Sequence, residues 1–251
     1  DKLVRNPDVN IVLFTGSWDV GSQIQQASSA MYDRIVAAEM GSKSAVIVCA
    51  DARLDLAVNA ALISAFKTSG QRCVSAGRVL VHESLLELFS EKLVGLARRL
   101  VIGDPLDPAT FTGPVINADA VAKVLRYNGL AKQEGAHVLL EGGQREGHFL
   151  TPFIYQIEAK PGVRCVREEV FGPHLALIPF RTNEEAAALY NYTPYGLSMA
   201  VITEDYRAMR FFRDECEFGM GYVNLPCIGA EVHLPFGGVK RSGNGHPSAA
   251  G

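Results

Sequence analysis

The sequence predicts an α/β protein with a largely parallel sheet, on the strength of three observations. Short apolar runs of strand length alternate with longer amphipathic stretches along the whole chain. No internal repeat or low-complexity segment interrupts this alternation. Hydrophobic residues fill 48% of the 251 positions, so the chain is able to bury a substantial core. Together these features exclude a disordered chain, a collagen-like chain and a small scaffold held by disulfides.

The first third of the chain contains two strand–helix pairs. Residues 9–14 form the first predicted strand, and a helix follows from about residue 20 to residue 36. Residues 45–49 then indicate a buried strand, and residues 51–67 the next helix. A break at residues 68–70 separates this helix from Gln71-Arg72-Cys73.

The clearest helix is predicted over residues 84–101, directly after a strand at 78–82. Ser84 and Glu87 have the spacing of a capping box. Apolar side chains share one face of this helix, namely Leu85, Leu88, Phe89, Leu93, Leu96 and Leu100. Turn-forming residues predict a loop over residues 103–114.

The rest of the chain continues the alternation. Helices are predicted at residues 117–134, 183–191 and 205–215, and strands at 138–140, 175–179, 199–203 and 222–225. Residues 229–251 indicate a loop, since repeated glycine and proline residues break any periodicity there.

Charge and cysteine content limit the classes of partner. The net charge of −3 gives no electrostatic reason to expect nucleic acid or an anionic membrane. No apolar run is long enough to span a bilayer, and the first residues do not form a signal peptide. The 5 cysteines contain no Cys-x-x-Cys pair, which argues against a metal site and a disulfide framework. We therefore expect reduced thiols in the cytoplasm, with a mitochondrial matrix as the alternative.

The two ends of the sequence predict that it is a piece of a longer protein. It lacks an initiator methionine and opens on residues typical of an internal element. It also stops after the glycine-rich residues 243–251, where the chain pattern is unfinished.

A candidate phosphate site follows the first predicted strand, at Phe14-Thr15-Gly16-Ser17. A helix N-terminus presents free backbone N–H groups and a partial positive charge, and both stabilise a phosphate. Ser17 is suited to cap the helix and to donate its hydroxyl, while Gly16 and Gly21 allow a ligand to approach the backbone. Short glycine-containing turns are common, so an ordinary turn capped by Ser17 is the alternative.

Cys73 and Glu39 form the candidate reactive pair. A thiolate is a strong nucleophile toward carbonyl carbon, and a helix N-terminus or a neighbouring cation lowers the pKa of a thiol. Cys73 follows a glycine turn after a helix and stands beside Arg72, so both influences are available. Glu39 precedes a glycine turn into a buried strand, where a carboxylate of raised pKa is able to act as general base toward water. The alternative is a buried structural thiol and a solvated surface charge.

Two further motifs hold candidate ligand-binding side chains. Glu169 lies in Glu168-Glu169-Val170-Phe171-Gly172-Pro173, where the turn is able to hold its carboxylate toward a ribose diol. A solvated pair of carboxylates is the alternative there. Asn224 ends a predicted strand, ahead of the loop at residues 227–231 and of Pro235-Phe236-Gly237-Gly238.

Taken together and in this order, the motifs resemble those of the aldehyde dehydrogenase superfamily over essentially the whole chain. They are Phe-Thr-Gly-Ser, Glu-x-Gly-x-Lys, Gly-Gln-x-Cys, Glu-Glu-x-Phe-Gly-Pro, Val-Asn and Pro-Phe-Gly-Gly-x-Lys-x-Ser-Gly. The resemblance implies the C-terminal, catalytic half of such an enzyme. Residues 1–40 would be the end of a Rossmann-like NAD(P)-binding domain, residues 41–241 a parallel-sheet catalytic domain, and residues 242–251 a truncated tail toward the oligomerisation region.

The resemblance also implies roles for single residues. Cys73 attacks an aldehyde to give a thiohemiacetal, hydride passes to NAD or NADP, and Glu39 activates the water that hydrolyses the resulting thioester. Gly16 and Ser17 lie at the pyrophosphate, while Glu169 holds the nicotinamide ribose. The remaining implied site residues are Phe171 beside the ribose and Asn224, Gly229, Ala230 and Phe236 on the substrate side. No metal ion is implied, and the full-length form is expected to be a homo-oligomer, either a dimer or a tetramer.

Some features depart from the family pattern. Gly41-Ser42 replaces the Gly-Gly that commonly follows the family's glutamate. The family's first half, with its lysine for the adenine ribose and its oxyanion-hole asparagine, is not in the sequence. Two other functions therefore stand beside the dehydrogenase: a truncated, non-catalytic chain that acts only through subunit association, and a cofactor-independent thiol esterase.

The substrate is indicated by two short segments. Gln71-Arg72-Cys73 and Gly229-Ala230-Glu231 resemble the α-aminoadipic semialdehyde dehydrogenase branch. Backbone N–H groups of a Gly-Ala loop are able to bind a carboxylate, so the resemblance implies a semialdehyde with an amino-acid head. A loop that merely closes the substrate tunnel is the alternative.

Overall fold

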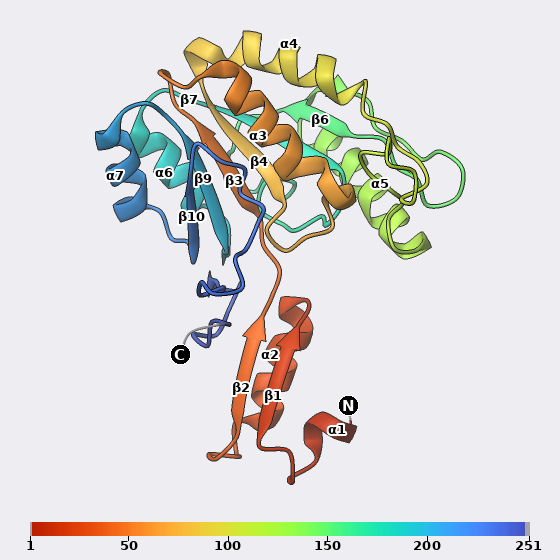
Figure 1. Cartoon of the computed structure of the whole chain (residues 1–251), viewed down its shortest axis with the longest axis vertical. Coiled ribbons are helices and arrows are strands. Elements are labelled where there is room, and N and C mark those ends of the chain that lie inside the picture. Colours follow the sequence, from red (N-terminus) through yellow and green to blue (C-terminus); the bar gives the residue numbers. More distant parts are fainter. Residues whose placement is uncertain (1, 249–251) are drawn as a thin grey trace.

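The structure is a computed structural model that describes residues 2–248, and a small N-terminal unit stands apart from a larger body (Figure 1). The small unit contains the helix α1 (Lys2–Arg5), the strand β1 (Ile11–Thr15), the helix α2 (Trp18–Ser28) and the strand β2 (Ile35–Glu39). The two strands pair in parallel, with Thr15 opposite Glu39. Their carboxyl ends therefore point toward the larger body, and residues 40–43 lead into it.

The strand β2 corrects the prediction of a single helix over residues 20–36. α2 ends at Ser28, and a turn follows in which Met31 N–H donates to Ser28 O and Arg34 N–H to Met31 O. Ile35 and Val36 then pair with β1 instead of continuing the helix. A short apolar run fits the period of a helix or of a strand equally well, and only its pairing with β1 decides between them.

The larger body is built on a seven-stranded sheet in the order β10-β9-β3-β4-β7-β6-β5. Its strands are β3 (Ser44–Val48), β4 (Ala76–His82), β5 (His137–Leu140), β6 (Phe153–Gln156), β7 (His174–Phe180), β9 (Ser198–Ile202) and β10 (Met220–Val223). Every pairing is parallel except that of the edge strand β5 with β6. The predicted α/β class with a largely parallel sheet is confirmed.

Helices cover both faces of this sheet (Figure 1). One layer contains α3 (Leu54–Phe66) and α4 (Leu86–Ala97), and the other contains α6 (Asn183–Asn191) and α7 (Tyr206–Glu215). Alternate side chains of β3 serve the two layers, because Val46 and Val48 pack with α3 and α4 whereas Ile47 packs with α6 and α7. Burial on both faces explains why β3 is a continuous apolar run. The helix α5 (Ala118–Gln133) is capped by Asn117, whose side chain accepts the Ala120 N–H.

The helix predicted over residues 84–101 is shorter and is capped differently. A short 3₁₀ turn, η2 (Glu83–Leu85), precedes α4, and the His82 side chain accepts the Ser84 N–H there. The hydroxyl of Ser84 lies 2.8 Å from Nδ1 of the same histidine. The prediction of a capping box at Ser84 and Glu87 is therefore wrong. The strand β6 has no counterpart in the prediction, because it is only four residues long and follows a glycine-rich loop.

The C-terminal tail crosses from the larger body to the small unit (Figure 1). It contains a short strand, β11 (Val239–Lys240), which pairs antiparallel with β8 (Tyr195–Gly196). The prediction of a loop throughout residues 229–251 is wrong for this strand. Residues 249–251 of the predicted loop lie outside the part that the structure describes. Within residues 2–248, no helix combines the length and the apolar character that a membrane crossing requires.

Candidate active site

A cavity of about 620 Å³ lies where the two units meet. The ends of β1 and β2 contribute to its wall from one side, and the segments that precede β4 and β7 contribute from the other. Its lining residues are Thr15, Gly16, Ser17, Met40, Gly41, Gln71, Arg72, Cys73, Val74, Lys123, Glu169, Phe171, Gly229, Ala230 and Phe236. The fold thus brings together, around one space, eight of the ten residues predicted for the site.

Cys73 is the only cysteine of the five that is not buried. It lies in a turn closed by the hydrogen bond from Ser75 N–H to Arg72 O. Burial in the cavity wall raises the pKa of its thiol, while its own N–H and the Val74 N–H lower it. The charges of Glu169 and Glu39 raise this pKa further. The four other thiols are buried, so Cys73 is the one placed to react with a ligand in the cavity.

Two expected causes of a low pKa at Cys73 are absent. No helix begins at this residue, since the turn leads directly into β4. The Arg72 side chain is exposed, and its Nε donates to the Thr68 hydroxyl at 2.8 Å. Neither of the two influences that the sequence left available, a helix N-terminus and Arg72, is therefore among the causes that set the pKa of this thiol.

A left-handed turn aims Cys73 at the cavity. Thr68, Ser69 and Gly70 have φ values of 54°, 56° and 67°. Residues other than glycine rarely adopt this left-handed backbone conformation. Ser69 is buried, and its hydroxyl donates to Gly113 O at 2.6 Å. Its N–H donates to the Thr112 hydroxyl, also at 2.6 Å. These buried hydrogen bonds hold the strained backbone in place.

We expect Gly70→Ala to lower the free energy of unfolding by more than about 2 kcal/mol. A Cβ at this position would overlap the carbonyl group of Gly172 and would also require an L-residue at φ 67°. Urea unfolding of the purified protein measures the effect. Gly95→Ala is the matched control, because a Cβ at this helical glycine of α4 meets nothing within 4 Å. The Gly95→Ala variant is expected to be slightly more stable than wild type. If Gly70→Ala lowers the free energy of unfolding no more than Gly95→Ala does, the steric explanation is contradicted.

Glu39 ends β2 with its carboxylate in an unusual environment. The residue is 9% exposed, and Oε2 has no hydrogen-bond partner among the described residues. Burial raises the pKa of its carboxyl to about 7, although a hydrogen bond from the Gly238 backbone opposes the shift. A carboxylate with such a pKa is suited to accept a proton from water near neutral pH. Glu39 does not line the main cavity itself, but the adjoining Met40 and Gly41 do.

The N-terminus of α2 opens into the same cavity. The Ser17 hydroxyl accepts the Val20 N–H at 3.3 Å and so caps this 11-residue helix, as predicted. Gly16 donates its N–H to Glu39 O at 3.1 Å, which ties the turn to the end of β2. The free N–H groups of this helix start are a suitable site for a phosphate. Gly21 lies instead beneath Met40 and does not line the cavity, so its predicted contact with a ligand is wrong.

Glu169 is held on the backbone that follows Glu39. Its Oε1 accepts the Ser42 N–H at 2.7 Å, and its carboxylate lies against Gly41 so closely that any side chain there would collide with it. Burial raises the pKa of this carboxyl, while the Ser42 N–H and the charges of Lys123 and Lys43 lower it. Phe171, two residues further on, is 40% exposed and has φ 60°, a strained backbone that turns it toward the cavity.

Two lysines near Glu169 were not among the predicted site residues. Lys123 comes from α5 and lines the cavity, where its charge favours the ionised form of Glu169. Lys43 is 2% exposed, and its Nζ has no hydrogen-bond partner within residues 2–248. It lines a second, water-sized space of about 20 Å³ together with Glu169. Only the lysine of the Glu-x-Gly-x-Lys motif carried a sequence signal, because the motif includes Lys43.

Lys43→Met is expected to stabilise the protein at neutral pH and to flatten its stability between pH 7 and pH 10. Burial lowers the pKa of Lys43 to about 7, so the unfolded chain, with an ordinary pKa near 10.4, binds the extra proton over this interval. Native stability therefore rises with pH there, and the penalty is complete below pH 7. Its size is on the order of 4 kcal/mol.

Urea unfolding at several pH values tests this prediction. Lys92→Met is the control, because Lys92 pairs with Asp55 at the surface. We expect this variant to show the same dependence of stability on pH as the wild type. A Lys43→Met variant that keeps the full rise between pH 7 and pH 10 would show that another group causes it.

Three of the four predicted substrate residues line the main cavity, and the fourth does not. Gly229, Ala230 and Phe236 line the main cavity and also a neighbouring one of about 620 Å³, so their loop separates the two spaces. Asn224 lines neither. Its side chain accepts the Thr203 N–H at 3.1 Å and donates to Thr203 O at 3.0 Å, which ties β10 to the end of β9. The prediction that Asn224 shapes the substrate side of the site is therefore wrong, and its amide stabilises the sheet edge instead.

One cavity of this α/β fold is thus lined by a thiol, a carboxylate and the start of a helix, and a second carboxylate, Glu39, adjoins it, which is an arrangement suited to a nucleotide-dependent enzyme. Within residues 2–248, no group of three or more His, Cys, Asp or Glu side chains is placed to hold a metal ion. Comparison with known proteins assigns the chain more closely. The profile of the aldehyde dehydrogenase family matches residues 1–251, and the chain belongs to this family.

Relatives with known names share this family. The chain is 35% identical to 1-pyrroline-5-carboxylate dehydrogenase 2 of Halalkalibacterium halodurans over 250 residues, which cover 97% of the chain and 48% of the relative. It is 39% identical to benzaldehyde dehydrogenase YfmT of Bacillus subtilis over 245 residues, which cover 98% of the chain and 50% of the relative. The chain thus spans about half the length of the curated relatives it matches.

Solved structures of family members have the same fold. A 1-pyrroline-5-carboxylate dehydrogenase from Thermus with bound NAD superposes with a TM-score of 0.92 at 33% identity, over 99% of this chain and 49% of that one. Glyceraldehyde-3-phosphate dehydrogenase GapN of Methanocaldococcus jannaschii, complexed with NADP, superposes with a TM-score of 0.91 at 34% identity, over 99% and 53%.

Proposed function

We propose that the natural protein carrying this chain oxidises an aldehyde to a carboxylic acid with NAD or NADP. The observation that supports this most directly is that Cys73, Glu169 and the Gly16-Ser17 turn open into one cavity. Family membership independently supports aldehyde oxidation. The oxidised nucleotide, when bound, supplies the acceptor for the hydride of the substrate.

Cys73 carries the covalent chemistry in this proposal. Its thiolate attacks the aldehyde carbon, and the carbonyl oxygen becomes the oxyanion of a thiohemiacetal. Loss of hydride from that carbon leaves a thioester on Sγ. Glu39 then takes a proton from water, and the resulting hydroxide attacks the thioester carbon. The carbon–sulfur bond breaks and regenerates the Cys73 thiolate, and the carboxylic acid and Glu39 each release one proton to solvent.

The chain's own residues fit the nucleotide that this reaction requires. The capped start of α2 offers free N–H groups to a pyrophosphate at Gly16 and Ser17. Glu169 offers a carboxylate, fixed by the Ser42 N–H, to a ribose diol. Lys123 brings a positive charge to the same wall of the cavity, so it is a further candidate contact for the nucleotide. Phe171 provides an apolar surface beside them.

The proposal is tested on the natural protein by its intact mass and by NAD and NADP reduction with an aldehyde. We expect a mass near twice that of the 251 residues and reduction that depends on Cys73. A protein of 251 residues that reduces neither nucleotide with any aldehyde would overturn the proposal. In that event the family resemblance would record ancestry.

We further propose a semialdehyde with an amino-acid head as the substrate. The loop at Gly229 and Ala230 separates the two cavities, where its backbone is placed to meet the end of a substrate remote from Cys73. The 1-pyrroline-5-carboxylate dehydrogenase relatives favour the same class. The specificity constants for α-aminoadipic semialdehyde, a plain aliphatic aldehyde and benzaldehyde test it. Equal values for all three would favour a loop that only closes the tunnel.

A thiol esterase is the second candidate function, because the proposed nucleophile and general base both lie within this chain. Hydrolysis of a p-nitrophenyl ester without nucleotide tests it, and dependence on both Cys73 and Glu39 is the expected signature.

Association with further polypeptide, as in a homo-oligomer, is favoured by the outer face of β1, where Leu13 is 80% exposed. Light scattering of the natural protein measures that association.

A further inference from the structure

The tail that follows Phe236 encloses Glu39 from the side opposite β1. We call residues 237–244 the strap. The Gly238 N–H donates to the Glu39 carboxylate, and a Cβ on Gly237 would stand 3.1 Å from Oε1 of Glu39. Gly243 forms an antiparallel bridge with Glu39 itself. On the opposite edge of β2, Glu39 pairs with β1, and its carbonyl accepts the Gly16 N–H.

Asn244 bonds the backbone just before Glu39. Its Oδ1 accepts the Ala38 N–H at 3.0 Å, and its Nδ2 donates to Val36 O at 2.6 Å. An amide side chain provides one acceptor and donors in one plane, so here it takes the place of a peptide group from a neighbouring strand. These two bonds extend the bonded edge of β2 beyond the bridge between Gly243 and Glu39.

Ser242 bonds the backbone just after Glu39. Its carbonyl accepts the Met40 N–H at 2.9 Å, and its hydroxyl donates to Gly41 O at 2.8 Å. The same hydroxyl accepts the Gly196 N–H of the larger body at 3.0 Å. Ser242 is fully buried. On the edge of β2 away from β1, the backbone on both sides of Glu39 is therefore bonded by the strap.

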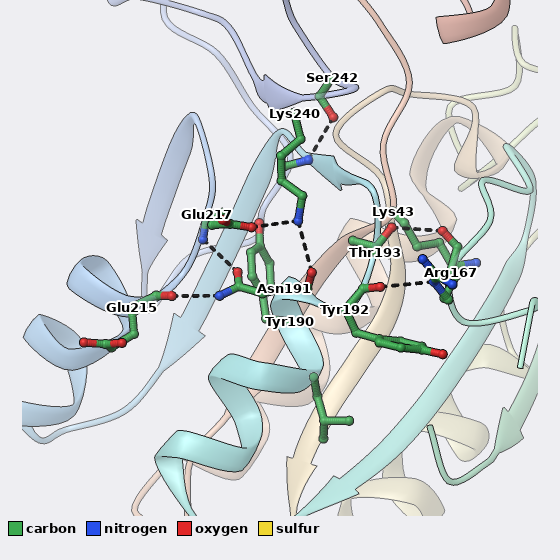
Figure 2. Close-up of polar contacts among 12 residues, drawn as sticks. Lys43, Arg167, Tyr190, Asn191, Tyr192, Thr193, Glu215, Glu217, Lys240 and Ser242 are labelled. Carbon is green, nitrogen blue, oxygen red and sulfur yellow. Dashed lines mark hydrogen bonds and ion pairs between the residues drawn. The ribbon is translucent and has the colours of Figure 1, made fainter. Parts of the chain in front are cut away.

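The strap is anchored in both units. Figure 2 shows the Lys240 ammonium directed at Glu217 and at the main chain of Asn191, at 2.8 Å and 3.0 Å. β11, which contains Lys240, also pairs with β8 of the larger body. Toward the small unit, the Arg241 guanidinium stacks on the Trp18 ring of α2 at 4.0 Å. A displacement of the strap would therefore change how Glu39 in the small unit stands relative to the larger body.

We propose that the strap aligns Glu39 with the Cys73 turn, and that Asn244 is a positioning residue for this alignment. The inference rests on the proposed function, in which Glu39 activates the hydrolytic water. Neither bond of Asn244 reaches a reacting atom, so its effect is confined to the placement of β2. A misplacement of about 1 Å in such a group costs up to about 100-fold in rate.

Asn244→Ala in the natural protein tests the inference by separating the two halves of the reaction. We expect steady-state turnover to fall by about 10-fold to 100-fold. The pre-steady-state burst of reduced nucleotide and the alkylation of Cys73 should stay within about twofold of wild type, because neither requires Glu39. Asn244→Asp keeps the acceptor for Ala38 N–H but cannot donate to Val36 O, so it should not restore turnover.

Asn191→Ala is the matched control. Its side-chain amide makes the same pair of backbone bonds, from Nδ2 to Glu215 O and from Glu217 N–H to Oδ1, both at 2.8 Å (Figure 2). The substitution removes one bond to Glu217, but it leaves the Asn191 carbonyl that receives Lys240 and the pairing of β11 with β8, so the strap stays anchored. We expect this variant to lose a comparable amount of stability and to keep its turnover within about threefold, since no bond to the strand of Glu39 is lost.

The result that would overturn the inference is an Asn244→Ala protein with wild-type turnover, or one in which the burst falls as much as the steady-state rate. Amide hydrogen exchange adds a readout that does not depend on activity. The Ala38 N–H should exchange at least about tenfold faster in Asn244→Ala, while the Ile47 N–H in the core strand β3 stays protected. Unchanged exchange at Ala38 would refute the strap itself. A natural protein without Cys73-dependent turnover would refute the proposed function instead, whatever the exchange shows.

Discussion

Cys73→Ala is expected to abolish aldehyde oxidation, with a loss of about 10⁴-fold or more in turnover. The proposed reaction proceeds through a covalent bond to Sγ, and no other thiol lines the cavity. Nucleotide reduction under saturating aldehyde measures the loss. Cys73→Ser should be nearly as inactive, because a serine hydroxyl is a much weaker nucleophile than a thiolate near neutral pH.

Thiol labelling separates the role of Cys73 from that of the buried cysteines. Native protein should react with an alkylating reagent at one thiol only, and the reaction should accelerate with rising pH because burial raises the pKa of Cys73. Cys216→Ala is the control, since Cys216 packs in the core against the sheet and its loss should affect stability alone. Turnover above a tenth of wild type in Cys73→Ala would show that this thiol is not the nucleophile.

Glu39→Gln is expected to have the second largest effect, a fall of about 10²-fold to 10⁴-fold in hydrolysis of the thioester. Glutamine keeps the shape of the side chain but cannot accept the proton of water. Because burial raises the pKa of Glu39 to about 7, hydrolysis in the wild type should fall as the pH drops through 7 and the carboxylate is protonated. The variant should lack this acidic limb. Stopped-flow measurement of the burst and of the steady rate at several pH values checks both statements.

Glu168→Gln provides a matched control for Glu39→Gln. Its carboxylate accepts from Arg164 Nε at 2.8 Å and from the Tyr127 hydroxyl, so it is turned away from the cavity. The Arg164 guanidinium lowers the pKa of Glu168, and no acidic limb near neutrality is expected from it. Equal losses in the two variants would mean that Glu39 has no special part in hydrolysis.

The parallel sheet and most of its helices could be predicted because their local pattern and their packing agree. β3 is apolar on both faces since both faces are covered, and the helix at Asn183–Asn191 has the same limits in sequence and structure. β2 and β6 could not be predicted in this way. The first is a short apolar run that fits either period, and the second has only four residues, so long-range pairing decides both.

The candidate site could be located because its residues occupy ordered motifs. Cys73, Glu169 and the Gly16-Ser17 turn come together as the motif order predicted. Asn224 was misassigned because the sequence does not show where a side-chain amide bonds, and its partner Thr203 lies 21 positions away. Lys123 carried no signal, since a single lysine on a helix is ordinarily a solvated charge.

The sequence by itself determined which chemical groups this protein brings to its cavity and the alternation of strands and helices that carries them, because both depend on residue type and local spacing. Only the tertiary structure decided the state of those groups. Burial raises the pKa of Cys73 and of Glu39 and lowers that of Lys43, against the expectation of a thiol activated by Arg72. Only the folded chain places Asn244 against the strand of Glu39, across 206 positions from Ala38. Desolvation and long-range hydrogen bonds arise from which segments meet in space, and local sequence does not specify them.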